Sequence, residues 1–147
     1  MARVELSQRE LQSGSLRVRV GVDADGALHE VTLPHEVPEN LTAADLSGML
    51  AQLAQFRRQS NGAPFTQQVW ERMSQIPWGH ALTYQELAEE VGSPLACRAV
   101  GQACAKNPLP LIVPCHRVLA NEGLGGFAYG AAWKSALLAL ETETRPT

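Results

Sequence analysis

Hydrophobic and polar residues alternate between positions 16 and 22, where every second residue is leucine or valine. The alternation resumes with Leu28 and Val31, beyond an Asp25-Gly26 pair that is typical of a tight turn between strands. A period of two residues is the pattern of a strand with one buried face. The pattern therefore predicts a half-buried β-hairpin near the start of the chain.

The hydrophobic spacing becomes helical in residues 42–59. Leu46, Met49, Leu50 and Leu53 of this segment follow one another at intervals of three, one and three residues, which places them on one helical face. Prolines and a glycine on either side of the segment indicate loops. We expect a small α+β portion over residues 1–61.

The remaining residues, 62–147, are predicted to be mostly helical. Hydrophobic residues at helical spacing and helix end signals indicate four further helices, over residues 65–76, 83–92, 93–107 and 131–141. The expected fold class is therefore α+β, with a hairpin and one helix at the N-terminus followed by a mainly helical C-terminal domain.

The second and third of these helices lie close together in the sequence. Thr83 and Glu86 stand in capping-box register, and Gly92 follows the last expected residue of that helix. Ser93 is the expected N-cap of the next helix, with Pro94 at its first position. Two short helices joined by a tight turn predict a helix-turn-helix, although many other helical hairpins share this pattern.

Composition narrows the class of protein. The first residues lack the apolar core of a secretion signal, and no apolar run approaches the roughly 18 residues of a membrane span, so we expect a cytoplasmic protein. The three cysteines, Cys97, Cys104 and Cys115, lack CxxC spacing, which predicts reduced thiols and no metal site. A formal charge of −3 argues against a protein that coats nucleic acid through charge alone.

Cys115 differs from the other two cysteines in its neighbours. The apolar run "LIVP" ends at Pro114 and is followed directly by Cys115, His116 and Arg117. This order places the thiol where a buried strand is expected to meet a polar turn. An imidazole there can accept the thiol proton directly or through a water, and the thiolate is the reactive form. A buried structural cysteine is the alternative, and it is the preferred interpretation of Cys97 and Cys104.

The wider sequence around Cys115 resembles a known family. "NPLPLIVPCHRV", preceded by "RAVGQACAKNP" and followed by "GLGGFAYGAAWKSALLALE", is similar to the active-site block of the O6-alkylguanine-DNA alkyltransferases, also called methylated-DNA–protein-cysteine methyltransferases. The resemblance runs from about Pro64 to Glu141. It implies that a variable N-terminal portion precedes a domain, 62–147, that binds DNA and moves an alkyl group from O6 of guanine to Cys115. Each molecule would react once, and no cofactor is implied.

The resemblance also implies roles for the neighbours of Cys115. His116 would act as the base through a bridging water, and Glu141 would orient its imidazole. Tyr84 would donate a proton to N3 of the leaving guanine. Asn107 would brace the turn around the cysteine.

Access to the base is implied to require its rotation out of the duplex. Arg98 matches the arginine that fills the vacated stack in this family. The neighbouring helix residues are small, as close approach to the minor groove requires: Ala96, Cys97, Ala99 and Gly101.

The substrate pocket departs from the family at one position. The residues expected to line it are Pro114, Val118, Phe127, Ala128 and Tyr129. Phe127 stands where family members often have tyrosine, so its ring can wall the pocket but lacks the hydroxyl. This difference bears on the range of alkyl groups more than on activity.

Three functions are consistent with these residues. The preferred hypothesis is a monomeric DNA repair protein that acts on double-stranded DNA containing alkylated bases, with O6-methylguanine as substrate and O4-methylthymine as a second candidate. A non-catalytic lesion sensor is the alternative, but such relatives lack the cysteine. A transcription regulator would need a basic or sequence-reading helix, which residues 94–105 do not provide.

Overall fold

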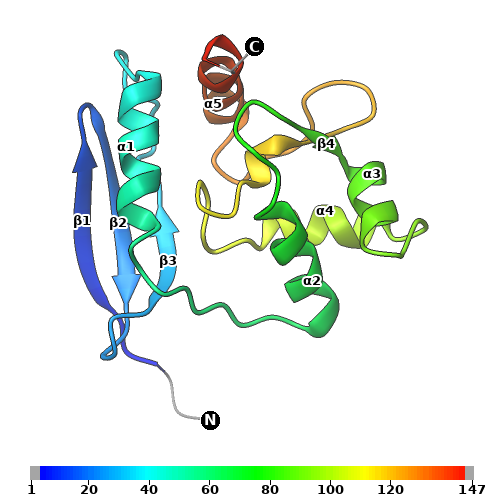
Figure 1. Cartoon of the computed structure of the whole chain (residues 1–147), viewed down its shortest axis with the longest axis horizontal. Helices are drawn as coiled ribbons and strands as arrows, with labels where there is room; N and C mark the ends of the chain where they lie inside the picture. The colour runs from blue at the N-terminus through cyan, green and yellow to red at the C-terminus, as the bar shows by residue number, and fades with distance from the viewer. Residues whose placement is uncertain (1–3, 145–147) are drawn as a thin grey trace. The chain divides into compact units, whose positions relative to one another are not determined.

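The structure of the protein is a computed structural model that describes residues 4–144 (Figure 1). Its contacts divide the chain into two compact units. The first unit extends to Ser60 and also includes Pro108–Ile112, and the second comprises Asn61–Asn107 and the chain from Val113 onward. The membership of Pro108–Ile112 in the first unit was not anticipated from the sequence.

The first unit contains an antiparallel sheet with the strand order β1-β2-β3. The strands are β1 (Ser7–Ser13), β2 (Leu16–Val22) and β3 (Leu28–Thr32), and Val20 of β2 lies opposite Val31 of β3. The predicted hairpin is thus confirmed as β2 and β3. Strand β1 was missed because it is an edge strand with mostly exposed residues, so its sequence shows no period of two.

One face of this sheet is covered by the helix α1 (Ala43–Leu53), as Figure 1 shows. Alternate residues of β2 are buried, and Leu46, Met49 and Leu53 of α1 are buried as well. The helix begins with a capping box in which Thr42 and Asp45 satisfy each other's backbone N–H groups. Asp45 also accepts a hydrogen bond from Ser15 at 2.7 Å, which ties the start of α1 to the β1–β2 turn.

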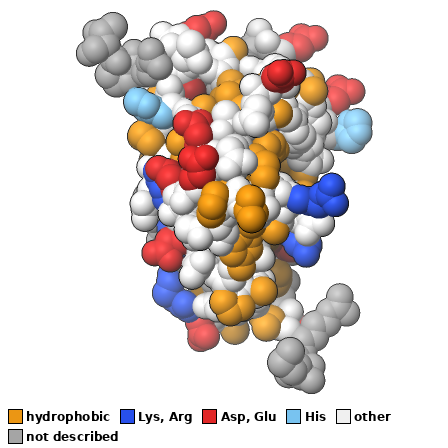
Figure 2. Space-filling model, turned by 90° about the vertical axis from the view of Figure 1, so that its right-hand side faces the viewer, with side chains coloured by type: hydrophobic (Ala, Val, Ile, Leu, Met, Phe, Trp, Pro, Cys, Tyr) orange, Lys and Arg blue, Asp and Glu red, His pale blue; other side chains and the backbone are white. Residues whose placement is uncertain are grey.

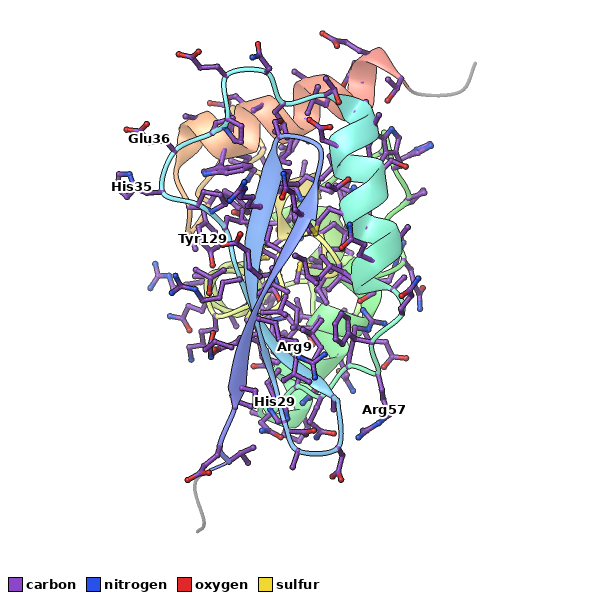
Figure 3. All side chains as sticks on the ribbon, turned by 90° about the vertical axis from the view of Figure 1, so that its left-hand side faces the viewer. Arg9, His29, His35, Glu36, Arg57 and Tyr129 are labelled. Atoms are coloured by element: carbon purple, nitrogen blue, oxygen red, sulfur yellow. The ribbon has the colours of Figure 1, made fainter. Side chains whose placement is uncertain are left out.

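At the opposite end of the hairpin, one side-chain pair holds the β2–β3 turn. Asp23 contacts His29 at 2.7 Å, and it also accepts backbone hydrogen bonds from Asp25 and Ala27. Figure 3 shows His29 near this end of the sheet. The cluster stabilises the turn that the Asp25-Gly26 pair predicts.

The second unit is mainly helical. Its helices are α2 (Pro64–Met73), α3 (Tyr84–Glu90), α4 (Cys97–Ala105) and α5 (Ala131–Glu143), with one 3-10 turn, η1 (Cys115–Arg117). Two short parallel strands, β4 (Leu82–Thr83) and β5 (Val118–Leu119), pair within it and were not predicted. The buried core of this unit includes Val69, Trp70, Met73, Leu87, Val100, Trp133 and Leu137. The indole of Trp70 donates to the carbonyl of Ala103 at 2.8 Å, which links α2 to α4.

The predicted capping box of α3 is confirmed, but the predicted start of α4 is wrong. Thr83 and Glu86 exchange both capping hydrogen bonds, and Gly92 follows α3 with φ of +79°. Helix α4 begins at Cys97 rather than after Ser93, because the N–H of Ala96 donates to the carbonyl of Ser93 and closes a turn. Pro94 occupies the second position of that turn, which suits proline as well as a first helical position does. Helices α3 and α4 contact each other, and their assignment as a helix-turn-helix stays a prediction.

The predicted strand before Cys115 is also wrong. Residues 108–113 form turns, and Leu111 has φ of +75°. Two prolines remove backbone donors from this run, and a left-handed residue interrupts an extended chain, so hydrophobicity alone misled the prediction. In the part of the chain that the structure describes, no helix has the length and apolar character needed to cross a bilayer.

Candidate active site

Cys115 is the first residue of η1 and lies in a tightly held turn. The carbonyl of Val113 accepts hydrogen bonds from the N–H of Cys115 at 2.8 Å and from the side-chain amide of Asn107 at 2.7 Å. The N–H of Arg117 donates to the carbonyl of Pro114 at 2.9 Å. The turn, rather than a strand, therefore positions the buried thiol.

His116 and Glu141 form a buried pair beside Cys115. Nε2 of His116 lies 2.7 Å from Oε2 of Glu141, which belongs to the last turns of α5. Burial by itself would raise the pKa of Glu141, but hydrogen bonds from His116 and Arg117 outweigh burial and lower that pKa to about 2. Burial lowers the pKa of His116, and the carboxylate only partly offsets this effect. At neutral pH the pair is a carboxylate and a neutral imidazole.

These charge states determine which nitrogen of His116 carries the proton. A carboxylate can only accept hydrogen bonds. Nε2 of His116 is therefore assigned the proton, and this N–H donates a hydrogen bond to Glu141. Nδ1 is left with a free lone pair. Within residues 4–144 this atom is buried and has no hydrogen-bond partner. A buried acceptor without a donor is rare, and here it marks the atom that can receive a proton.

Arg117 is a site residue that the sequence reasoning did not select. Its Nε and Nη2 donate to the two oxygens of Glu141 at 2.8 and 2.9 Å, and its Nη1 donates to the carbonyl of Ile76 at 2.6 Å. The N–H of Gly79 adds a longer contact of 3.3 Å to the same carboxylate. Glu141 is therefore held on several sides, and the fork of Arg117 fixes its plane. The sequence signal was available, since Arg117 directly follows the Cys-His pair.

Cys115 opens on a cavity of about 240 Å³. Most of the residues that line the cavity are small or aromatic. The full lining is Tyr84, Gly101, Cys104, Ala105, Cys115, Gly126, Phe127 and Ala128. The ring of Phe127 meets the imidazole of His116 edge-on, with 6.5 Å between the ring centres, and Tyr129 lies behind Phe127 at 5.9 Å. Of the residues predicted to line the pocket, Phe127 and Ala128 line this cavity. Pro114 and Val118 are buried next to η1 instead, and Tyr129 contacts Phe127 but is not a lining residue.

Burial and nearby charges act on both thiols of this cavity. Burial raises the pKa of Cys115, while a hydrogen bond from Asn107 and the charge of Lys134 act in the opposite direction. Burial also raises the pKa of Cys104, to about 12, so its thiol stays protonated. The cavity thus contains one thiol with a neighbouring base and one without.

Lys134 is a second site residue that was missed. It is fully buried, and its Nζ donates to the carbonyl of Val118 at 2.6 Å and to that of Gly126 at 2.9 Å. The hydroxyl of Tyr84 also donates to Gly126, at 3.4 Å. These contacts fix the segment that carries the cavity wall. A lysine between Trp133 and Leu137 on the apolar side of α5 was the signal for a buried cation.

The residues predicted to contact DNA lie at the start of α4. Arg98 is exposed, Ala96 is the N-cap, and Cys97, Ala99 and Gly101 are partly buried. A side chain added at Gly101 would meet nothing within 4 Å, so the helix surface is open there. Seen from the side on which α3 lies, the molecule shows hydrophobic side chains gathered along the middle of the surface (Figure 2).

Among residues 4–144, no group of three or more histidine, cysteine or acidic side chains is arranged to hold a metal ion. The thiol of Cys115 and the phenol of Tyr84 line the cavity, and the oriented imidazole of His116 is buried next to Cys115. This combination suits nucleophilic attack on a substrate whose leaving group needs a proton.

Known proteins share both the sequence and the fold. A family model described as the 6-O-methylguanine DNA methyltransferase, DNA binding domain, matches residues 64–143. The chain is 47% identical over 78 residues to a methylated-DNA–protein-cysteine methyltransferase of Saccharolobus solfataricus, which covers 53% of this chain and 50% of the relative. It is 47% identical over 83 residues to the bifunctional transcriptional activator/DNA repair enzyme Ada of Escherichia coli, which covers 56% of this chain and 23% of Ada. The alignments thus span half or less of the length of these curated relatives.

Solved structures match over nearly the whole chain. The O6-methylguanine methyltransferase of Mycobacterium tuberculosis is 30% identical, with 97% of this chain and 96% of the other covered and a TM-score of 0.75. A structure of the M. tuberculosis protein in complex with DNA matches with 30% identity, 95% coverage of both chains and a TM-score of 0.75. These matches confirm the α+β fold class, and the family model covers more than half of the chain. The chain belongs to the 6-O-methylguanine DNA methyltransferase family.

Proposed function

We propose that the protein repairs DNA by transferring the alkyl group from O6 of an alkylated guanine to Sγ of its own Cys115. The observation that carries the proposal is the unpartnered Nδ1 of His116, buried beside a thiol that opens on a cavity. The similarity to methylated-DNA–protein-cysteine methyltransferases supports the same reaction.

The first step is removal of the proton from Cys115. Burial raises the pKa of this thiol, so it is protonated at neutral pH until a base acts on it. Nδ1 of His116 accepts the proton through a bridging water. The imidazole becomes positive, and the carboxylate of Glu141, whose own pKa is about 2, stabilises that charge through Nε2.

The second step is displacement at the alkyl carbon. A bond forms between Sγ of Cys115 and the carbon, while the bond from that carbon to O6 breaks and its electron pair goes to the guanine. Tyr84 lines the cavity, and its hydroxyl protonates N3 of the departing base. Burial raises the pKa of Tyr84, so the proton is present at neutral pH. The product is a thioether with no facile route back, and each protein reacts once.

Double-stranded DNA containing the lesion is the proposed partner, bound by a monomer through the second unit. Helices α3 and α4 act as a helix-turn-helix whose small residues approach the minor groove, and Arg98 fills the stack after the damaged base has rotated into the cavity. The exposed position of Arg98 and the absence of acidic residues from α4 support this assignment. O4-methylthymine is a second candidate substrate.

The test is mass spectrometry after the protein is mixed with duplex DNA containing O6-methylguanine. We expect a gain of one methyl group per molecule, located on the peptide that contains Cys115. Cys115→Ala should abolish the gain. Tight binding of the lesion without any change in mass would contradict the proposal and favour a non-catalytic sensor.

A further inference from the structure

Leu95 is a large hydrophobic residue whose side chain is wholly in water. Its side chain is 100% exposed, while Val4, the other exposed large hydrophobic residue in the described part of the chain, is 54% exposed. Partial exposure of single apolar residues is common in soluble proteins. Complete exposure of a leucine is different, because none of its surface contributes to the stability of the fold.

The backbone on both sides of Leu95 is held in place. The N–H of Ala96 donates to the carbonyl of Ser93 at 2.8 Å, and the side chain of Gln85 donates to the carbonyl of Pro94 at 2.9 Å. Proline at position 94 also restricts the backbone. The leucine is therefore presented by an ordered turn rather than by a loose loop that could fold it inward.

The helix that follows Leu95 favours an anionic partner, whereas α3 brings one carboxylate near the turn, because Gln85 donates both to Glu89 and to the carbonyl of Pro94. Helix α4 begins two residues further on and contains no acidic residue, while Arg98 and Lys106 are exposed on it or at its C-cap. The side chains at positions 96, 97, 99 and 101 are small. An exposed leucine next to a helix with small side chains and a positive charge suits a ligand in which phosphates alternate with hydrocarbon groups. A sugar-phosphate strand has this chemistry.

Duplex DNA is the occupant that other observations favour. The matched DNA-binding domain covers residues 64–143 and so includes Leu95. We infer that the Leu95 side chain packs against the deoxyribose carbons at the edge of a DNA groove and adds an apolar contact to the electrostatic one made by Arg98. The inference rests on the DNA binding stated in the proposed function, but not on alkyl transfer.

The experiment measures the affinity of the full chain for a labelled, undamaged duplex as a function of salt concentration. Leu95→Ala should weaken binding about fivefold, as expected for the loss of a partly buried leucine contact. The slope of the logarithm of affinity against the logarithm of salt concentration should not change, because an apolar contact releases no counterions. Arg98→Ala should instead reduce that slope by up to about 0.9, because it removes a cation that displaces counterions from the duplex.

Two further variants make the result specific. Val4→Ala truncates an exposed hydrophobic side chain of the first unit and should leave DNA affinity unchanged. Leu95→Lys should increase the salt slope by about 0.9, because it places a cation at the same point. Unfolding temperatures of all variants should match that of the parent.

Unchanged affinity of Leu95→Ala would overturn the inference and would point to a protein partner for this turn. An equal loss of affinity in Val4→Ala would also overturn it, because the effect would not be specific to Leu95. Because the duplex is undamaged, this measurement remains readable if Cys115 proves not to be alkylated. Alkylation of Cys115 with no effect of Leu95→Ala would leave the proposed function standing and reject only the inference.

Discussion

At the scale of single residues, the carboxylate of Glu141 links stability to chemistry. It accepts from the imidazole of His116 and from the guanidinium of Arg117, and all three side chains are buried. One carboxylate therefore neutralises a permanent cation and also orients the base of the proposed reaction. Neither partner can be removed without consequences for the other.

Glu141→Gln should impair both of these roles. The amide cannot neutralise Arg117 and does not impose the tautomer that leaves Nδ1 of His116 free, so we expect the single-turnover rate of methyl transfer to fall at least about a hundredfold. Denaturant unfolding should show a loss of about 3 kcal/mol, because a buried charge loses its partner.

The control is a second carboxylate in the same unit. Glu90 pairs with Arg72 at 2.8 Å, but both side chains are partly exposed. Glu90→Gln should cost less than about 1 kcal/mol and leave the rate of transfer unchanged. Equal losses of stability in the two variants would show that burial of the Glu141 cluster is not what makes it important.

Single residues also show where sequence reasoning ended. Cys115 and His116 were selected because a thiol and an imidazole stand side by side in the sequence, whereas Glu141 was selected through a resemblance. The structure places His116 and Glu141 2.7 Å apart. Arg117 and Lys134 were not selected, because a charged residue is read from sequence as solvent-exposed unless its partners are known. Those partners are a carboxylate 24 residues away for Arg117 and backbone carbonyls for Lys134.

At the scale of secondary-structure elements, two glycines differ in the backbone conformation that they must adopt. Gly92 follows α3 with φ of +79°, whereas Gly101 lies within α4. A side chain at either position would meet nothing within 4 Å, so only the backbone distinguishes them.

Replacing each glycine by alanine should therefore change stability in opposite directions. Gly92→Ala should destabilise the protein by about 1 kcal/mol, because alanine is strained at positive φ. Gly101→Ala should stabilise it by about 0.5–1 kcal/mol, because alanine favours the helix. The midpoint of denaturant unfolding would measure both effects, provided that the dependence of the unfolding free energy on denaturant concentration is unchanged. Stability changes of the same sign in the two variants would show that the turn after α3 differs from the one described.

Elements whose patterns were strong were predicted correctly. The alternation in residues 16–22 and the capping box at Thr83 gave a strand and a helix start close to those observed. Predictions failed for two elements whose positions are not determined by hydrophobic periodicity or by a capping motif. Strand β1 has no buried face to pattern it, and the start of α4 was decided by a turn that contains Pro94.

At the scale of the whole molecule, acid should act on the second unit through its buried site. The pKa of His116 is lowered from 6.5 and that of Glu141 is lowered from 4.5 to about 2. For a group whose pKa is lowered by folding, the contribution to stability is present above the unfolded pKa and is lost as the pH falls below it. Both groups thus act in the same direction.

We expect the stability of this unit to fall as the pH drops below about 6.5, through His116, and further below 4.5, through Glu141. Each group contributes a slope of up to about 1.4 kcal/mol per pH unit. All three tryptophans, Trp70, Trp78 and Trp133, lie in the second unit, so their fluorescence follows its unfolding. His116→Gln should flatten the profile between pH 6.5 and 4.5, whereas replacement of the exposed His80 should not; identical profiles would contradict the assignment.

The two thiols of the cavity have a consequence for measuring damage in cells. Cys104 lines the same cavity as Cys115 and burial raises the pKa of both thiols, but only Cys115 has His116 as its direct neighbour in the chain. In the proposed reaction only one sulfur atom can receive the alkyl group, and the bond is permanent. The alkylated fraction of the Cys115 peptide would therefore count repaired lesions one by one, and the mass of the added group would identify the agent that caused them.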